Sequence, residues 1–523
     1  MKRFAWIIGL VLCTVCTVQA KDRVIERPPL LAWSSNSIEV DKIVMSDTVT
    51  TVYVKAYYRP KYWIKIATGS FLKDNNGTLY PIRKGVGITL DKEFWMPESG
   101  EAEFQLLFPP IPENVTSLDF SEGDFDGAYK IWGIQLNEKN FRKTPLPKDA
   151  IIHKINKKAQ LPTPELTYAK ATLKGRVLDF KADMPASGKL HLNDPVRWLN
   201  FAEEVNINED GTFQVQTDVI TITPATLVFP FAQIPCLLAP GKEISIIINT
   251  AECTRQQSHL QKDSKPYGKK AYYSGYLAEL QQELMENSIQ TNLVSNPRET
   301  VNEVIGKDID GVKNYFVEKR RDIHKQIEEA PLSLAAKEVL KANTDITTGI
   351  GIFMAKDILM RAHVASQKLN KEQTKEYYMN TKIEFPDNYF DVFKELVLNS
   401  PADLYAPEYA YGIGVFASRK DLLEQHLGTN QGILFQMAEA CRYYRSIEDF
   451  TPLTTEQTAA LEALPSPAYK EMLTDFNRKL LKKIELNKQK TGYQINEVGE
   501  VSNEELFSTI ISKFKGHVLL VDY

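Results

Sequence analysis

Cysteine is scarce in this chain of 523 residues, and its placement excludes a dithiol site from most of the sequence. The one CxxC spacing, Cys13-Thr-Val-Cys16, lies in an apolar N-terminal stretch that we interpret as a removable signal peptide. The cysteine inventory therefore applies to the chain after this segment. Cys236, Cys253 and Cys441 remain there, and no two of them have redox-motif spacing.

The sequence also lacks a surplus of basic residues. It has 63 lysines and arginines against 67 aspartates and glutamates, a formal net charge of -4. Proteins that bind nucleic acid normally carry a basic patch or stripe, so we expect no nucleic-acid partner. With 43% hydrophobic and 25% charged residues, the composition is that of a folded chain and excludes wholesale disorder.

Long hydrophobic runs are missing beyond the N-terminus, so we predict no transmembrane segment after signal removal. Residues 1–20 have a basic start, an apolar stretch and a small-residue cleavage site at 18–20, which is typical of a secretory signal peptide. We expect an exported, periplasmic protein. Lipid attachment at Cys13 or Cys16 is the less favoured alternative, because the preceding residues are bulkier than the lipoprotein pattern usually has.

Hydrophobic periodicity predicts a multidomain β + α protein that begins with two antiparallel β-sandwich-like domains. The first covers residues 21–145, where residues alternate with period two and Asn76-Gly77 is a strong hairpin signal. A proline-bearing linker follows at 146–165. The second, smaller β-sandwich domain is expected at 166–255, with a hairpin turn at Asp210-Gly211.

Helical periodicity begins at about residue 265 and predicts an all-helical domain over 265–490, with prolines between the helices. Residues 491–523 have a different pattern. A short helix is expected there, with Ser502 and Glu505 as a capping box, followed by the apolar strand 518–521. A continuous apolar run is typical of a strand buried on both faces of an α/β sheet.

These segments resemble the thioredoxin-domain family of TlpA-like thiol:disulfide oxidoreductases. FKGHVLLVDY at the end of the sequence is similar to the family's central strand. The earlier segments similar to its accessory domains are RPKYWIKI, EFWMPESGEAEFQLLFPPIP, LDFSEGD, YKIWGIQL, GRVLDF, EDGTF, LLAPGKE and EFPDNYFDVFKELVLNSP. The resemblance implies that 491–523 is the truncated start of a thioredoxin-like domain, preceded by substrate-positioning domains.

The family's catalytic CxxC is absent after this strand, so no residue of this sequence takes over a catalytic role. Disulfide exchange needs a reactive thiolate and a nearby second thiol. We therefore expect an accessory region that is inactive in dithiol exchange as written, so its standing as an enzyme is open. An interrupted reading frame, a partial gene model and a true short protein all remain open as explanations for the ending.

The rival hypothesis is a non-catalytic envelope binding or scaffold protein whose β domains contact a protein or a glycan. Tyr57, Tyr58, Tyr62 and Trp63 crowd one hairpin of the first domain and form a candidate binding surface. Exposed aromatic rings stack on sugars or anchor protein interfaces. Period-two alternation, however, sends several of these side chains into the core.

Two interpretations stay open for Cys236 and Cys253, which are 17 positions apart: a structural disulfide, or two separate thiols, which we favour. Cys441 is expected to be a buried apolar residue. The stretch 121–127 has acidic residues near a glycine turn but lacks the other ligands of a calcium loop. The histidines are scattered and no cofactor motif occurs, so we expect neither metal nor cofactor.

Overall fold

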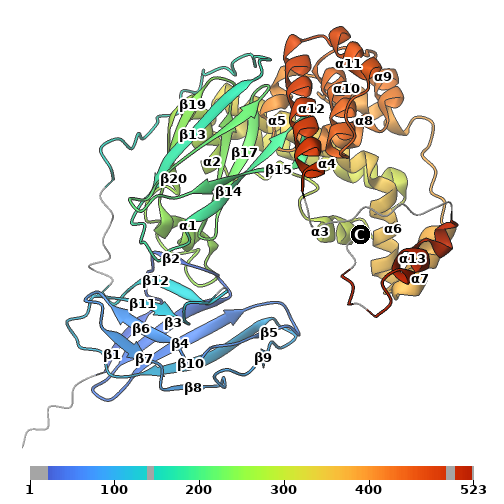
Figure 1. Cartoon of the computed structure of the whole chain (residues 1–523). Coiled ribbons are helices and arrows are strands. Elements are labelled where there is room, and N and C mark those ends of the chain that lie inside the picture. The colour runs from blue at the N-terminus through green and yellow to red at the C-terminus, as the bar shows by residue number, and fades with distance from the viewer. Residues whose placement is uncertain (1–21, 126, 138–145, 491–500, 517, 521–523) are drawn as a thin grey trace, which may run out of the picture.

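The computed structural model describes residues 22–125, 127–137, 146–490, 501–516 and 518–520. The predicted signal peptide lies outside these ranges. Within them the chain is a multidomain β and α protein, in which a β-sandwich, a second β unit and a helical unit follow one another (Figure 1). Among the described residues, no helix combines the length and apolar character needed to span a bilayer.

The first β-sandwich consists of two five-stranded sheets, with strand orders β1-β3-β4-β10-β8 and β2-β12-β11-β6-β7. Its strands are β1 (Arg23–Glu26), β2 (Ala32–Trp33), β3 (Ile38–Met45), β4 (Thr50–Tyr57), β6 (Phe71–Asp74), β7 (Leu79–Pro81), β8 (Lys84–Val86), β10 (Glu101–Phe108), β11 (Ser117–Ser121) and β12 (Lys130–Gln135). Alternate residues of β4 are buried, as period two requires, and they join one apolar core between the sheets.

The hairpin expected at Asn76-Gly77 is present between β6 and β7. Gly77 has a positive φ of 87°, a conformation that costs glycine little. The Asp74 carboxylate accepts hydrogen bonds from the backbone N–H groups of Asn76 at 2.8 Å and Thr78 at 2.9 Å, which fixes the turn.

The second β unit has two four-stranded sheets, β16-β13-β19-β20 and β15-β14-β17-β18. Its strands are β13 (Ala169–Val177), β14 (Ser187–Asp194), β15 (Trp198–Asn206), β16 (Thr212–Val219), β17 (Thr223–Phe229), β18 (Ala232–Leu238), β19 (Glu243–Ile248) and β20 (Ala271–Gly275). One pair departs from the antiparallel expectation: β13 and β19 run parallel, because the chain passes through the opposite sheet between them.

Strand β20 lies beyond the predicted end of this unit at residue 255 and inside the span predicted to be helical. It pairs antiparallel with β19, and the short helix α1 (Thr250–Gln257) lies between the two in sequence. Tyr272 and Tyr273 are buried there, Tyr273 in the core of this unit. Pairing with the apolar strand β19 thus makes this segment a strand. The helical periodicity further along the chain gave no sign of this strand.

The helical unit packs directly on the second β unit. Its α-helices are α2 (Ala278–Glu286), α3 (Pro297–Glu303), α4 (Ile309–Glu329), α5 (Leu334–Phe353), α6 (Ala355–Gln367), α7 (Lys371–Asn380), α8 (Tyr409–Ala417), α9 (Lys420–Leu427), α10 (Ile433–Glu448), α11 (Thr455–Ala460) and α12 (Pro467–Lys488). Short 3-10 helices cover Tyr389–Glu395, Pro401–Tyr405 and Leu461–Ala463. Val196, Ile220 and Leu237 of the β unit belong to the same apolar core as these helices.

The C-terminal region contains the expected short helix, α13 (Asn503–Ser512). Its N-cap is Ser502, but the serine side chain makes no capping hydrogen bond within the described residues, so the predicted capping box does not form there. We expected an apolar strand at 518–521, of which the structure describes residues 518–520. These three residues lie in no strand, and Val518 and Leu520 are fully exposed. A strand needs a hydrogen-bonded neighbour, and the described residues supply none. Val521 lies outside them.

The first sandwich joins the second β unit through a buried carboxylate. Glu39 of β3 is only 2% exposed, and its two oxygens accept hydrogen bonds from the turn that follows α1. The donors are Ser258 Oγ at 2.5 Å, His259 N at 2.8 Å and Leu260 N at 3.3 Å. Beside them, Gln261 Nε2 donates to the Pro28 carbonyl at 2.8 Å.

Substituting Glu39→Ala should weaken this joint, because the buried Ser258 hydroxyl and the partly buried His259 N–H would lose the carboxylate that accepts from them. We expect the free energy of unfolding of the first sandwich to fall by about 3 kcal/mol in urea denaturation followed by tryptophan fluorescence. The control is Glu103→Ala, whose carboxylate is exposed and pairs with Lys55, and which should cost less than about 0.5 kcal/mol. Equal losses would contradict a structural role for the buried carboxylate.

Candidate functional site

The first sandwich carries a two-stranded ribbon formed by β5 (Trp63–Ile64) and β9 (Phe94–Trp95). In this antiparallel pair Trp63 lies opposite Trp95, and Ile64 lies opposite Phe94. Directly opposed residues point to the same face. The ribbon therefore presents both tryptophans on one side, where Trp63 is 45% exposed and Trp95 is 60% exposed.

Apolar contacts behind the ribbon hold it in place. Ile64 and Met96 are buried in the core of the sandwich, while Phe94 packs against Phe104 of β10. Backbone hydrogen bonds extend the pairing, from Met96 N to Tyr62 O at 2.8 Å and from Lys61 N to Met96 O at 3.2 Å. The tryptophan pair is thus mounted on a fixed backbone, which lowers the entropy lost when a partner covers it.

Two tyrosines extend the exposed aromatic area. Tyr62 is 53% exposed, and its ring meets that of Tyr58 edge to face with centroids 6.4 Å apart. The Arg59 guanidinium lies 5.6 Å from the centroid of the Tyr62 ring. We call the set of Tyr58, Tyr62, Trp63 and Trp95 the aromatic surface.

Charged groups lie beside the aromatic surface. Lys61 and Glu98, both largely exposed, form an ion pair at 2.8 Å next to the residues that bear the rings. Large planar rings with neighbouring hydrogen-bond donors and acceptors are suited to binding through stacking and polar contacts. The aromatic surface and this ion pair together form the candidate binding site.

Tyr57, the fourth predicted residue, lies apart from this set. Its ring stacks on that of His259 with centroids 4.0 Å apart, so it belongs to the joint between the two β units. Burial, with a further contribution from the Glu39 carboxylate, raises the pKa of Tyr57 above its ordinary value. The rings of Tyr58 and Tyr62 are in contact, and Trp63 is the residue that follows Tyr62 in the chain. The structure adds Trp95, which the sequence reasoning missed although EFWM reads as a short strand.

The three thiols of the described chain are separate from one another and buried. Cys236 and Cys253 are both free thiols in this structure. Burial raises the pKa of each to about 12. Cys441 on α10 is also buried, with a pKa raised to about 12, and its Sγ donates to the Pro195 carbonyl at 3.0 Å.

Glu122 and Asp124 of the acidic stretch 121–127 have structural partners, while Asp126 lies outside the described residues. Both oxygens of the buried Glu122 carboxylate accept backbone hydrogen bonds, from Ala67 N at 2.9 Å and Tyr129 N at 3.0 Å. Asp124 pairs with Lys130 at 3.1 Å. Over the described residues, no cluster of three or more histidine, cysteine or acidic side chains has the geometry of a metal site.

No family model matches the chain, and no curated protein matches it. Similar solved structures include a pullulanase complexed with maltotriose from Anoxybacillus sp. LM18-11. The two sequences are 13% identical, the match covers 36% of this chain and 24% of the pullulanase, and the TM-score is 0.15. The Group B Streptococcus pullulanase SAP has 9% identity, coverages of 36% and 22%, and a TM-score of 0.13.

The Bacillus anthracis TIE protein has 11% identity, coverages of 44% and 40%, and a TM-score of 0.11. The chain spans about a quarter of the length of the two pullulanases. With TM-scores this low, the similarities define neither a shared fold nor a function.

Buried thiols with a pKa near 12 should be inert in the folded protein. At about pH 8 only about one such thiol in ten thousand is ionised, and none is accessible. With residues 1–20 removed, we expect iodoacetamide to leave Cys236, Cys253 and Cys441 unmodified in the native chain and to alkylate all three in urea. Rapid native alkylation of any one, read by peptide mass, would contradict this assignment.

Proposed function

We propose that this chain acts by binding, as the substrate-positioning accessory region of an exported TlpA-like thiol:disulfide oxidoreductase, and that it does not itself exchange disulfides. The observation that carries the binding role is the exposed pair of Trp63 and Trp95 on the ribbon. In this proposal the aromatic surface contacts the polypeptide substrate of the oxidoreductase.

The energetics of the tryptophan pair support a binding role. A tryptophan side chain buries roughly 150–250 Å² when covered, and about half of each ring system here is exposed. At about 25 cal/mol per Å², covering both releases on the order of 5 kcal/mol before the costs of association. Such a pair accounts for a large part of the affinity of a moderate binder.

The thiols and the C-terminal helix support the remaining parts of the proposal. The described thiols are buried, and the proposal therefore assigns disulfide exchange to a thioredoxin-like domain, as the family resemblance implies. Leu506 and Ile510 of α13, with Phe514 just after it, are each more than one-third exposed. An apolar stripe on a helix is normally covered by a sheet or another helix. A thioredoxin-like sheet is the cover that the family resemblance implies.

The second candidate is a non-catalytic envelope binding or scaffold protein whose β domains contact a protein or a glycan. The ion pair of Lys61 and Glu98 beside the aromatic surface favours it. A sugar ring can stack on an indole while its hydroxyls form hydrogen bonds with neighbouring charged groups. The two candidates differ in the chemistry of the partner.

The test measures the binding of two probes, an unfolded polypeptide and a soluble oligosaccharide, to the native chain and to one double variant. We expect a reduced, carboxymethylated, unfolded polypeptide to bind the chain, and Trp63→Ala with Trp95→Ala to weaken binding at least about tenfold by fluorescence anisotropy. The matched control is Leu79→Ala, an exposed apolar residue of the same sandwich, which should change affinity less than about twofold.

Two other outcomes would decide against parts of this proposal. Binding of a soluble oligosaccharide but not of the polypeptide, lost in the same double variant, would favour the envelope scaffold. Equal affinity of the double variant and the native chain for every probe that binds would remove the aromatic surface from the function.

A further inference from the structure

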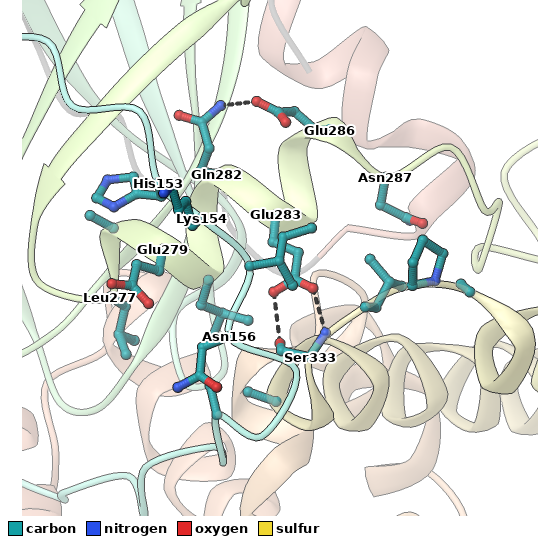
Figure 2. A pocket seen from close by; sticks show the side chains of 18 of the residues that line it. His153, Lys154, Asn156, Leu277, Glu279, Gln282, Glu283, Glu286, Asn287 and Ser333 are labelled. Carbon is teal, nitrogen blue, oxygen red and sulfur yellow. Dashed lines mark hydrogen bonds between the residues drawn. The ribbon is translucent and has the colours of Figure 1, made fainter.

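A groove of about 750 Å³ lies where the linker, the end of β20, α2 and the turn before α5 meet (Figure 2). The groove is remote in sequence from the aromatic surface and shares no residue with it. Its walls combine apolar side chains, such as those of Ile151, Ile155 and Leu332, with polar ones. This volume is within the range of sites that enclose small molecules or short peptide segments.

One wall is a linker segment with unused backbone groups. Residues 151–155 lie in no helix or strand, and their N–H and C=O groups form no hydrogen bond with any other described backbone group. Ile151, His153, Lys154 and Ile155 line the groove, whereas Ile152 does not. Most of this open segment therefore faces the groove.

The isoleucines of this segment are unusually exposed. Ile151 is 47% exposed, Ile152 is 61% exposed and Ile155 is 52% exposed. A single exposed apolar residue needs no explanation, but three β-branched ones within five positions of a linker form a patch. β-branched side chains favour the strand conformation, so the segment is well suited to pair with another strand.

Side chains contact two backbone carbonyls on the outer edge of β20. The register with β19 directs the carbonyls of Ala271 and Tyr273 away from the sheet. Gln282 Nε2 donates to the Ala271 carbonyl at 3.2 Å, and His153 Nε2 lies 2.8 Å from the Tyr273 carbonyl. Side chains thus occupy these two carbonyls, and the backbone of 151–155 is open to a different strand.

The opposite wall is rigid. Both oxygens of the Glu283 carboxylate on α2 accept hydrogen bonds from Ser333, the N-cap of α5, at 2.5 Å from N and 2.7 Å from Oγ (Figure 2). One turn later, Glu286 accepts from Gln282 and pairs with Lys269. These contacts fix α2 before any ligand arrives, which favours binding by preorganisation.

Charges of both signs line the groove. The exposed Lys154 comes from the linker and the exposed Glu279 from α2. With charges of both signs, the groove does not have the uniform electrostatic potential that would favour a simple cation or anion. Apolar and polar side chains beside open backbone groups are features with which proteins bind an added strand.

We propose that this groove binds an extended polypeptide segment. Its backbone pairs with residues 151–155, and its apolar side chains pack against Ile151, Ile155 and Leu332. This inference deepens the proposed function, on which its biological meaning rests, by naming a second contact for a polypeptide substrate. At about 3.3 Å per residue, five paired residues span roughly 17 Å.

The test uses the full chain without residues 1–20 and a fluorescein-labelled peptide of eight residues, in which valine alternates with serine and lysine. We expect saturable binding by anisotropy. Two further peptides carry N-methyl groups on the odd or on the even residues, so each lacks the N–H groups of one edge. One should bind at least about tenfold more weakly and the other less than about twofold more weakly, because an added strand pairs through one edge.

Variants locate the site. Ile151→Asp with Ile155→Asp should weaken binding of the first peptide at least about tenfold, whereas Ile152→Asp, a matched control outside the groove, should change it less than about twofold. Circular dichroism checks that each variant is folded. Trp63→Ala with Trp95→Ala should leave affinity for this peptide unchanged, which separates the groove from the aromatic surface.

No saturable binding, equal binding of all three peptides, or equal loss in the Ile152→Asp control would overturn the groove assignment. These outcomes leave the aromatic surface untouched. Loss of affinity for the unfolded polypeptide only in the tryptophan variant would keep the proposed function while removing the groove from it.

Discussion

The buried carboxylate of Glu39 determines how the first sandwich is attached to the rest of the chain. A carboxylate is costly to bury unless its oxygens are hydrogen-bonded, and here the turn after α1 provides donors from Ser258, His259 and Leu260. These bonds form only when β3 and α1 are correctly placed, so they specify one orientation of the two units. Tyr57 stacking on His259 adds to the same contact, as does Thr254 Oγ1 donating to the Leu31 carbonyl at 3.0 Å.

Beyond this joint, the second β unit and the helices share one apolar core, so they cannot move as independent bodies without exposing it. The molecule therefore holds two candidate contact regions, the aromatic surface at the ribbon of β5 and β9 and the groove between the linker and α2. Figure 1 shows that the ribbon belongs to the first sandwich, apart from α2. A molecule with separated contacts is suited to an elongated partner such as an unfolded chain, because linked contacts add avidity when their spacing is fixed. Reactive chemistry is not needed for this role, which agrees with the buried state of Cys236, Cys253 and Cys441.

Local patterns in the sequence predicted the two β regions, the helices and the Asn76-Gly77 hairpin, because alternation, helical periodicity and turn residues act over short distances. Long-range pairing escaped this reasoning. Strand β20 forms because β19 offers it an edge, and the parallel pair of β13 and β19 depends on a path through the opposite sheet. The candidate site shows the same division. Trp63 was predicted, whereas its partner Trp95 comes from a strand 32 positions later, and only the pairing of β5 with β9 brings them together.

We infer that the first sandwich, the second β unit and the helical unit form one rigid body. The distance between a residue of the first sandwich and a residue of the helical unit tests this inference most directly. Leu79 on the first sandwich and Leu481 on α12 are both exposed, and replacing each with cysteine allows spin labelling, because the thiols of the described chain are buried. Double electron–electron resonance should then give a single narrow distance distribution that broadens in the Glu39→Ala variant. A broad or multimodal distribution in the otherwise native chain would contradict the account, since it would mean that the sandwich swings freely on its joint.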